Sequence, residues 1–388
     1  MNTDYVRRLA EQNREYTVMI RRRIHQNPEL GMREYKTAAL IREELDNMGI
    51  AWKPVGETGT YGILPATEPG GATVALRADI DALPVCEETG LPFSSQNAGV
   101  MHACGHDCHA AMLLGSARVL SAMEHRPNTV AFVFQPAEEL AAGAHQMIEH
   151  GALENVDVIY GSHVWPDIPA GKVGLRDGGF MAGADKFTIR ITGRGGHGSQ
   201  PENCCDPIPA LTSIVDAIHQ IKGLSLRGDA PLALTVGYIH CGSAMNIIPD
   251  GGEVGGTIRW FDRASQNVVH KRLKELADGS CAMYGCQAEV EITELCPCTS
   301  NDPICAAQAR GALSAMYGEN AVSTDFQLAL GGEDFSFYGR VIPSVFGMIG
   351  CGMGEKTVSL HNPHFTLDEK ILEMGVALYA KFACDYHK

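Results

Sequence analysis

The chain has 388 residues, 45% of them hydrophobic, and this length predicts two domains with separate buried cores. A formal net charge of −15, without a basic stripe, argues against binding to nucleic acids or to anionic membranes. The N-terminus lacks the pattern of a secretory signal and no apolar run approaches membrane-spanning length, so we expect a soluble, cytoplasmic protein. Thirteen scattered cysteines favour reduced thiols over a disulfide framework.

Helices and strands are expected to alternate in the first half of the chain. Hydrophobic periodicity predicts helices at residues 4–26, 36–48, 109–123 and 143–150. Short apolar runs predict buried strands at residues 73–78, 129–135 and 156–161. This alternation is typical of an α/β domain.

The pattern changes after residue 179. Residues 185–192 alternate as in a half-buried strand, and a helix, two strands, a helix and a strand are expected after it, at 207–221, 232–240, 253–261, 265–284 and 287–293. This βαββαβ order is that of a ferredoxin-like unit. The earlier pattern then returns, with a helix at 305–317, a strand at 345–350 and a helix at 367–383. We therefore predict a two-domain α/β protein, in which residues 1–179 and 294–388 form a domain with a central mixed sheet and residues 180–293 are inserted into it.

The densest polar cluster is the segment MHACGHDCH, which places Cys104, His106 and His109 between an apolar strand and the start of a helix. Loops at strand ends are where α/β sheets carry their functional sites. Thiolate and imidazole are usual ligands of zinc and related ions. Taken alone, the cluster fits a metal site and a purely structural role equally well.

Two consecutive carboxylates, Glu138 and Glu139, follow the strand at 129–135. Adjacent side chains do not share a face, so one can bind a metal while the other accepts a proton. A solvated acidic loop is the alternative interpretation. His163 follows another apolar strand, and His361 precedes the last helix, so several loops offer further ligand types.

Asp79 and Asp81 alternate at the end of the strand at 73–78, which turns both carboxylates to one side. Asp81 is expected to orient a ligand histidine, although such a residue can also cap the following turn. In the inserted domain, His197 lies on a glycine-flanked loop, where an imidazole can stabilise an oxyanion. Asn246 and Arg259 are candidate partners of a substrate carboxylate, or else an ordinary turn residue and surface residue.

Eight segments in this order, RADIDALP, MHACGHDCH, QPAEE, GSHVW, GGHGSQP, GSAMNIIPD, GGEDFSFYG and LHNPHF, resemble the M20 peptidases. The resemblance is to the branch of aminoacylases, hippurate hydrolases and auxin-conjugate (IAA-amino acid) amidohydrolases. It implies a catalytic domain with two divalent metal ions, zinc or manganese with cobalt as a further option. It also implies an inserted lid through which homodimers, and in some cases higher homo-oligomers, form.

The same resemblance implies a role for each site residue. Cys104 corresponds to a ligand that bridges the two ions, and the remaining ligands are His106, Glu139, His163 and His361. Glu138 corresponds to the general base and Asp81 to the acid that orients the metal centre. The substrate contacts are His197 and Asn246, often supplied by the neighbouring subunit, and Arg259. The implied reaction is hydrolysis of the amide bond of an N-acyl amino acid by a metal-activated water.

The chain departs from the pattern of this branch at a few positions. Cys108 replaces a common glycine, Glu202 follows Pro201 where histidine is frequent, and Cys204 and Cys205 lie in the same loop. An acidic residue near a substrate favours an ammonium group, so a dipeptidase or aminopeptidase with the same metal centre is the alternative. A metal-binding protein without activity is a remote alternative, because the base Glu138 is present.

Overall fold

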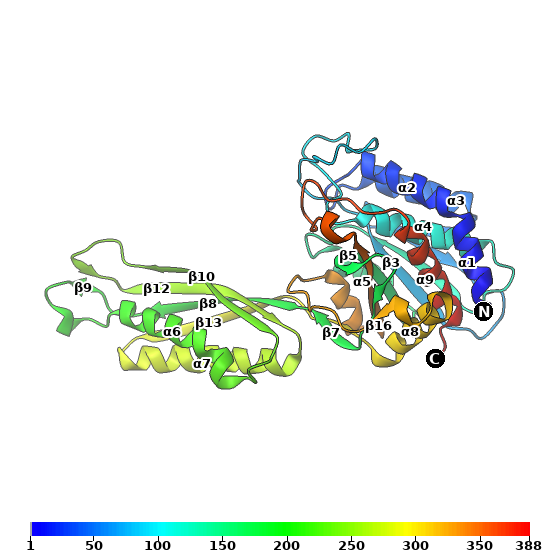
Figure 1. Ribbon diagram of the computed structural model, residues 1–388. Coiled ribbons are helices and arrows are strands. Elements are labelled where there is room, and N and C mark those ends of the chain that lie inside the picture. The colour runs from blue at the N-terminus through cyan, green and yellow to red at the C-terminus, as the bar shows by residue number, and fades with distance from the viewer. Residues whose placement is uncertain (1) are drawn as a thin grey trace. The chain divides into compact units, whose positions relative to one another are not determined.

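The computed structural model describes residues 2–388, and their chain divides into two compact units (Figure 1). The first unit contains residues 2–178, 300–327 and 334–388, and the second contains residues 179–299 and 328–333. The grouping of residues 328–333 with the second unit is not indicated by the sequence pattern. Of the helices in residues 2–388, none combines the length and the apolar character that a membrane crossing requires.

The first unit is built on an eight-stranded mixed sheet with the order β1-β2-β4-β3-β5-β16-β6-β15. The strands are β1 (Ala51–Val55), β2 (Gly59–Leu64), β3 (Thr73–Asp79), β4 (Thr129–Gln135), β5 (Val158–Pro169), β6 (Val173–Gly174), β15 (Val322–Ser323) and β16 (Ser344–Gly352). The central strands β4, β3, β5 and β16 are parallel. Because parallel strands end at the same edge of a sheet, the segments that follow β3 and β4 lie close together.

Seven α-helices accompany this sheet: α1 (Thr3–Gln12), α2 (Arg14–Gln26), α3 (Tyr35–Asn47), α4 (His106–Ser121), α5 (Gly143–Glu149), α8 (Pro303–Tyr317) and α9 (Ile371–Asp385). The helices α4 and α9 pack against each other and against β3 (Figure 1). Almost every residue of α4 is buried, and most of its residues after the polar first turn are small or apolar. It is therefore a rigid support for the residues at its N-terminus.

One sequence-based prediction about the first unit was wrong. The single helix expected at residues 4–26 is interrupted at Asn13, whose backbone (φ −93°, ψ 4°) leaves the helical region. The Asn13 side chain donates a hydrogen bond to Leu9 O at 2.8 Å and so closes α1. Asparagine competes with the backbone for hydrogen bonds in this way, which hydrophobic periodicity does not reveal.

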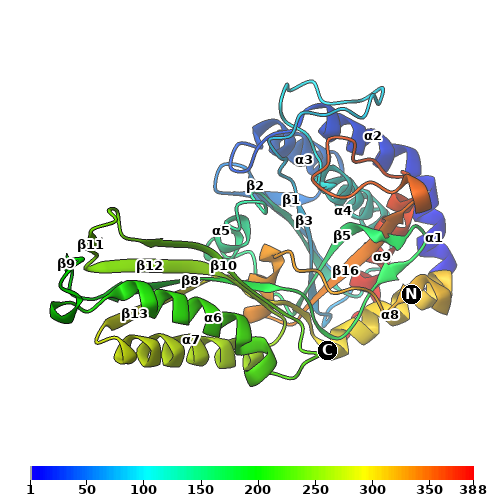
Figure 2. The same ribbon diagram turned by 60° about the vertical axis from the view of Figure 1, so that its left-hand side comes forward.

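The second unit has the predicted βαββαβ order. Its elements are β8 (Gly183–Thr192), α6 (Pro207–Ser225), β10 (Leu232–Cys241), β12 (Gly251–Trp260), α7 (Arg263–Met283) and β13 (Gln287–Cys296). The four strands form an antiparallel sheet in the order β10-β12-β8-β13, and α6 and α7 pack side by side along it (Figure 2). Apolar side chains of the sheet and both helices form a separate core, including Phe187, Ile189, Ile214, Val254 and Leu273.

Short elements complete the chain. In the second unit, β9 (Gly196–His197) pairs with β11 (Ile247–Ile248), and a 3₁₀ turn, η1, covers Pro201–Asn203. In the first unit, 3₁₀ turns lie at η2 (Glu319–Ala321), η3 (Asp334–Arg340) and η4 (Gly354–Lys356). The strands β7 (Gly178–Met181) and β14 (Thr299–Asn301) lie where the chain passes from one unit to the other.

Candidate metal centre

The first unit brings together the five residues that the resemblance assigns as metal ligands. Cys104 lies two residues before α4 and His106 is its first residue, Glu139 follows β4, His163 is in β5, and His361 is in the loop before α9. They form two groups, Cys104 with His106 and His163, and Cys104 with Glu139 and His361. Within each group, one potential ligand atom of every residue lies within 4.8 Å of the others. Cys104 is therefore common to both groups.

The distances between these atoms fit bound ions. Cys104 Sγ lies 3.4 Å from His163 Nε2 and 3.2 Å from His361 Nε2, and His361 Nε2 lies 3.2 Å from Glu139 Oε1. Two ligands bound tetrahedrally to one ion at roughly 2.0–2.3 Å are separated by about 3.3–3.8 Å. The side chains are thus already close to the spacing that metal coordination requires.

The hydrogen bonds of His106 also fit the binding of a cation. Its Nδ1 donates to Asp81 Oδ1 at 3.0 Å, which leaves Nε2 as the ring atom that can bind a cation. This Nε2 atom is buried and has no hydrogen-bond partner among residues 2–388. A buried polar atom without a partner is costly, and a divalent ion would satisfy it. Asp81 Oδ2 also accepts the Glu139 backbone N–H at 3.0 Å, so one carboxylate fixes two of the ligands.

Burial controls the charges of the ligands. It raises the pKa of the Cys104 thiol well above its ordinary value, so a thiolate at this position needs a cation beside it. Burial lowers the pKa of His163 well below its ordinary value, which keeps this imidazole neutral, as a ligand must be. The hydrogen bond to Glu139 raises the pKa of His361. The donor set of one thiol, three imidazoles and one carboxylate suits zinc and related divalent ions.

The backbone is unusual at three positions in this centre. Gly105, which precedes His106, has a φ of 88°, and a Cβ atom there would lie 2.4 Å from Val164 Cγ2. Ala137 has a φ of 51° and His361 a φ of 62°, in the left-handed region that non-glycine residues rarely adopt. The His361 backbone N–H donates to Ala103 O at 2.8 Å, which ties the loop to the segment that carries Cys104. Backbone strain of this kind is common at functional sites.

Glu138, the predicted base, is half-buried beside the ligands. One of its carboxylate oxygens lies within 4.8 Å of ligand atoms of His106 and Glu139. Its Oε1 accepts the backbone N–H of Asp334 at 3.4 Å. Glu138 does not belong to the two groups that share Cys104, but it forms a third group with His106 and Glu139.

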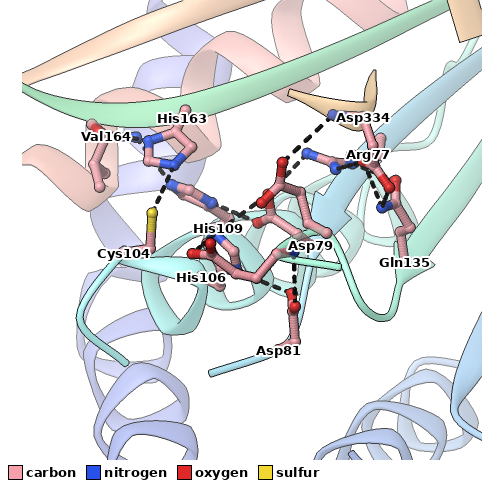
Figure 3. A network of polar contacts seen from close by, with 12 residues as sticks. Arg77, Asp79, Asp81, Cys104, His106, His109, Gln135, His163, Val164 and Asp334 are labelled. Carbon is pink, nitrogen blue, oxygen red and sulfur yellow. Dashed lines mark hydrogen bonds and ion pairs between the residues drawn. The ribbon is translucent and has the colours of Figure 1, made fainter. Parts of the chain in front are cut away.

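A buried ionic network supports the centre and was not anticipated from the sequence (Figure 3). Arg77, in the middle of β3, is fully buried and donates to Asp79 Oδ2 at 2.8 Å, Gln135 Oε1 at 2.8 Å and Asp334 Oδ1 at 3.0 Å. Gln135 and Asp334 are also fully or almost fully buried. The available signal was an arginine inside an apolar strand, because such a charge requires buried partners.

His109 is not part of either group of ligands. The sequence grouped it with Cys104 and His106, but its ring hydrogen-bonds to Asp79 Oδ1 at 2.6 Å and to the Val164 backbone N–H at 2.9 Å. Of the three residues in the predicted cluster, Cys104 and His106 thus belong to the groups that share Cys104, whereas His109 bonds to Asp79 and Val164.

The three candidate substrate-binding residues lie in the second unit, at two separate places. His197 and Asn246 are neighbours and exposed, since His197 pairs with Ile247 and the Gly198 N–H donates to Asn246 O at 2.9 Å. Arg259 lies at the other end of β12, opposite Ala184. Eight residues of strand, about 26 Å, separate Arg259 from Gly251, the end of β12 nearest His197. Arg259 and His197 of one chain therefore do not meet around one small ligand.

Residues 75–385 match the peptidase family M20/M25/M40. The chain belongs to this family. An IAA-amino acid hydrolase ILR1-like 2 of Arabidopsis thaliana is 40% identical to this M20 chain over 383 residues, covering 96% of it and 86% of the plant protein. An N-acetylcysteine deacetylase of Bacillus subtilis is 37% identical over 369 residues, 94% of this chain and 95% of the relative.

A solved structure is similar to this M20 protein in both fold and sequence. The YXEP protein of Bacillus subtilis, described as a dinuclear metal-binding M20 peptidase, superimposes with a TM-score of 0.84 at 34% identity, covering 96% of this chain and 98% of that protein. The chain is thus an M20 amidohydrolase, a hydrolase that acts on carbon–nitrogen bonds.

Proposed function

We propose that this M20 protein hydrolyses the amide bond of N-acyl amino acids with two divalent metal ions. The observation that carries the proposal is the position of Cys104, shared by two compact groups of ligand side chains. One ion would be held by Cys104, His106 and His163, and the other by Cys104, Glu139 and His361. Zinc, manganese or cobalt ions there would supply activation of a water molecule and polarisation of the amide carbonyl.

In this proposal, Glu138 carries out the proton transfers. Its carboxylate accepts a proton from the attacking water and delivers it to the leaving amine nitrogen. Asp81 keeps His106 in the tautomer that directs Nε2 toward the ion. The names of the relatives support acylated amino acids as the substrate class, because they describe an IAA-amino acid hydrolase and an N-acetylcysteine deacetylase.

We further propose that the protein acts as a homodimer joined through the inserted lid, residues 180–293. The separation of Arg259 from His197 along β12 supports this arrangement. Arg259 binds the substrate carboxylate, while His197 and Asn246 contact the substrate of the neighbouring subunit, where His197 stabilises the oxyanion. The edge strand β10 carries the exposed apolar side chains Tyr238 and Ile239, which suits a subunit contact.

Purified protein tests the reaction. It is stripped with a chelator, reloaded with zinc, manganese or cobalt, and incubated with N-acetyl, N-benzoyl and longer N-acyl amino acids and with dipeptides. We expect hydrolysis of the acylated substrates only after reloading. Preferential cleavage of dipeptides would identify a peptidase instead, and no hydrolysis with any ion would refute the enzyme assignment.

The variant Glu138→Gln tests the base. It should bind metal as the wild type does and lose about 10²–10⁴-fold in kcat, the usual contribution of a general base. Glu68→Gln, at an exposed carboxylate, is the matched control and should retain full activity. Unchanged kcat in Glu138→Gln would show that another group accepts the proton.

Mixing two inactive variants tests the shared site. In a mixed dimer of Glu138→Gln with His197→Ala, one of the two sites has both native residues if His197 acts across the dimer. Random exchange of subunits should then restore about a quarter of the wild-type activity. No recovery in dimers shown to have exchanged would place His197 in the site of its own chain.

A further inference from the structure

His109 connects the buried ionic network to one of the ligand strands. Its neighbours Asp79 and Val164 are buried, and both ring nitrogens have partners within hydrogen-bonding distance. A backbone N–H can only donate, so Nε2 must accept the hydrogen bond from Val164. The proton is then on Nδ1, which donates to Asp79. His109 therefore has no lone pair left for a metal ion.

The hydrogen bonds continue from Val164 to His163. The carbonyl oxygen of Val164 accepts from His163 Nδ1 at 2.6 Å, and His163 Nε2 faces Cys104 Sγ at 3.4 Å (Figure 3). His109 thus holds the backbone N–H of Val164, and the backbone carbonyl of the same residue fixes the orientation of the His163 ring. The series runs from a carboxylate through two imidazoles to the sulfur of Cys104.

The far end of this series is fixed as well. Asp79 Oδ2 is paired with Arg77, whose other donors contact Gln135 and Asp334. All these side chains are fully or almost fully buried. Since side chains in such a network have few alternative rotamers, the position of the His109 ring is determined on both sides.

We propose that His109 is a positioning residue, which holds Val164 and thereby orients His163 toward the metal ion. The inference rests on the metal centre of the proposed function. It assigns His109 to the group of Cys104, His106 and His163, and leaves the group of Cys104, Glu139 and His361 without such support. Removal of His109 should therefore weaken the binding of one ion and not of the other.

Competition of the metal-free protein with a chromophoric zinc chelator measures both affinities. The variant His109→Phe preserves the ring and removes both hydrogen bonds. We expect it to bind one zinc ion as the wild type does and the second at least about tenfold more weakly, as is usual when a residue that orients a ligand is lost. His109→Gln retains a donor and an acceptor, and should recover part of the affinity.

The control is Leu113→Ala, which removes buried apolar atoms from the same helix without changing the series of hydrogen bonds. It should lower stability and leave both zinc affinities unchanged. If His109→Phe and His109→Gln bind two zinc ions with wild-type affinities, or if Leu113→Ala weakens the same ion, the inference is wrong while the proposed function stands. If the wild type binds no ion, both are wrong.

Discussion

Replacing Arg77 by methionine tests whether the buried network is needed for the stability of the first unit. Arg77 compensates two buried carboxylates, Asp79 at 2.8 Å and Asp334 at 3.0 Å. Breaking one buried pair by removing a partner costs about 3–5 kcal/mol, and methionine fills much of the arginine volume. Arg77→Met breaks two buried pairs, but a buried carboxylate that has lost its cation can take up a proton. We therefore expect the free energy of unfolding to fall by about 3–5 kcal/mol rather than by twice as much.

The measurement is urea unfolding of the metal-free protein, followed by tryptophan fluorescence. Trp52 and Trp165 lie in the first unit and Trp260 in the second, so a Trp260→Phe background restricts the signal to the first unit. Each variant is compared with the wild type in that background.

A second substitution makes the test specific. Arg77→Met combined with Asp334→Asn removes one stranded charge, and should be more stable than Arg77→Met alone by at least about 1 kcal/mol. Arg33→Met, at an exposed arginine, should change stability by no more than about 0.5 kcal/mol. A loss below about 1 kcal/mol for Arg77→Met, or no recovery in the double variant, would refute the reasoning.

Two further predictions concern His25 and Gly105. Burial opposes the charge of His25, but Asp107 and Glu87 raise its pKa to about 9. The charged imidazole therefore stabilises the fold fully below pH 6.5, and this stabilisation is lost as the pH rises through about 9. His25→Gln should therefore flatten the fall in unfolding free energy between pH 6.5 and 9, and parallel curves for variant and wild type would contradict this. Left-handed backbone strain alone costs an alanine about 1–2 kcal/mol. The control Gly99→Ala should lose no more than this, because an added Cβ there meets no atom within 4 Å. Gly105→Ala should lose more, because its Cβ would also collide with the Val164 side chain. Equal losses in urea unfolding would show that contact with the Val164 side chain is unimportant.

The regular elements of the fold could be predicted because they depend on local patterns. The strand β4 has the predicted bounds, and the βαββαβ order of the second unit follows from alternation in strands and helical periodicity in α6 and α7. The hairpin β1–β2 was missed, since its short strands contain Pro54, Gly59 and Gly62 rather than a continuous apolar run. The strand β5 also continues beyond the predicted apolar run to Pro169.

The site was predictable to the level of residue types. Cysteine, histidine and glutamate at strand ends indicated a metal site, but residue types and spacing did not separate ligands from their supports, and only the family resemblance proposed which were which. His106 and His109 illustrate this limit, because both are histidines on the first turn of α4. Their hydrogen bonds differ, because Asp81 bonds to the ring of His106, whereas Asp79 and the Val164 backbone bond to the ring of His109. Arg77 and Asp334, 257 positions apart, meet only in the folded chain.

The insertion of one unit into the other has a consequence for the synthesis of the protein. His361 and α9 follow the inserted residues, and the Tyr379 hydroxyl of α9 donates to the Arg77 backbone oxygen at 2.7 Å. Roughly 200 residues separate His163 from His361, which corresponds to about 10–40 s of translation at 5–20 residues per second. The second unit can fold on the ribosome during this interval, before the last segment of the first unit, residues 334–388, has been made. The proposed group of Cys104, Glu139 and His361 is therefore completed only when the chain is nearly finished, whereas Cys104, His106 and His163 all precede the inserted unit.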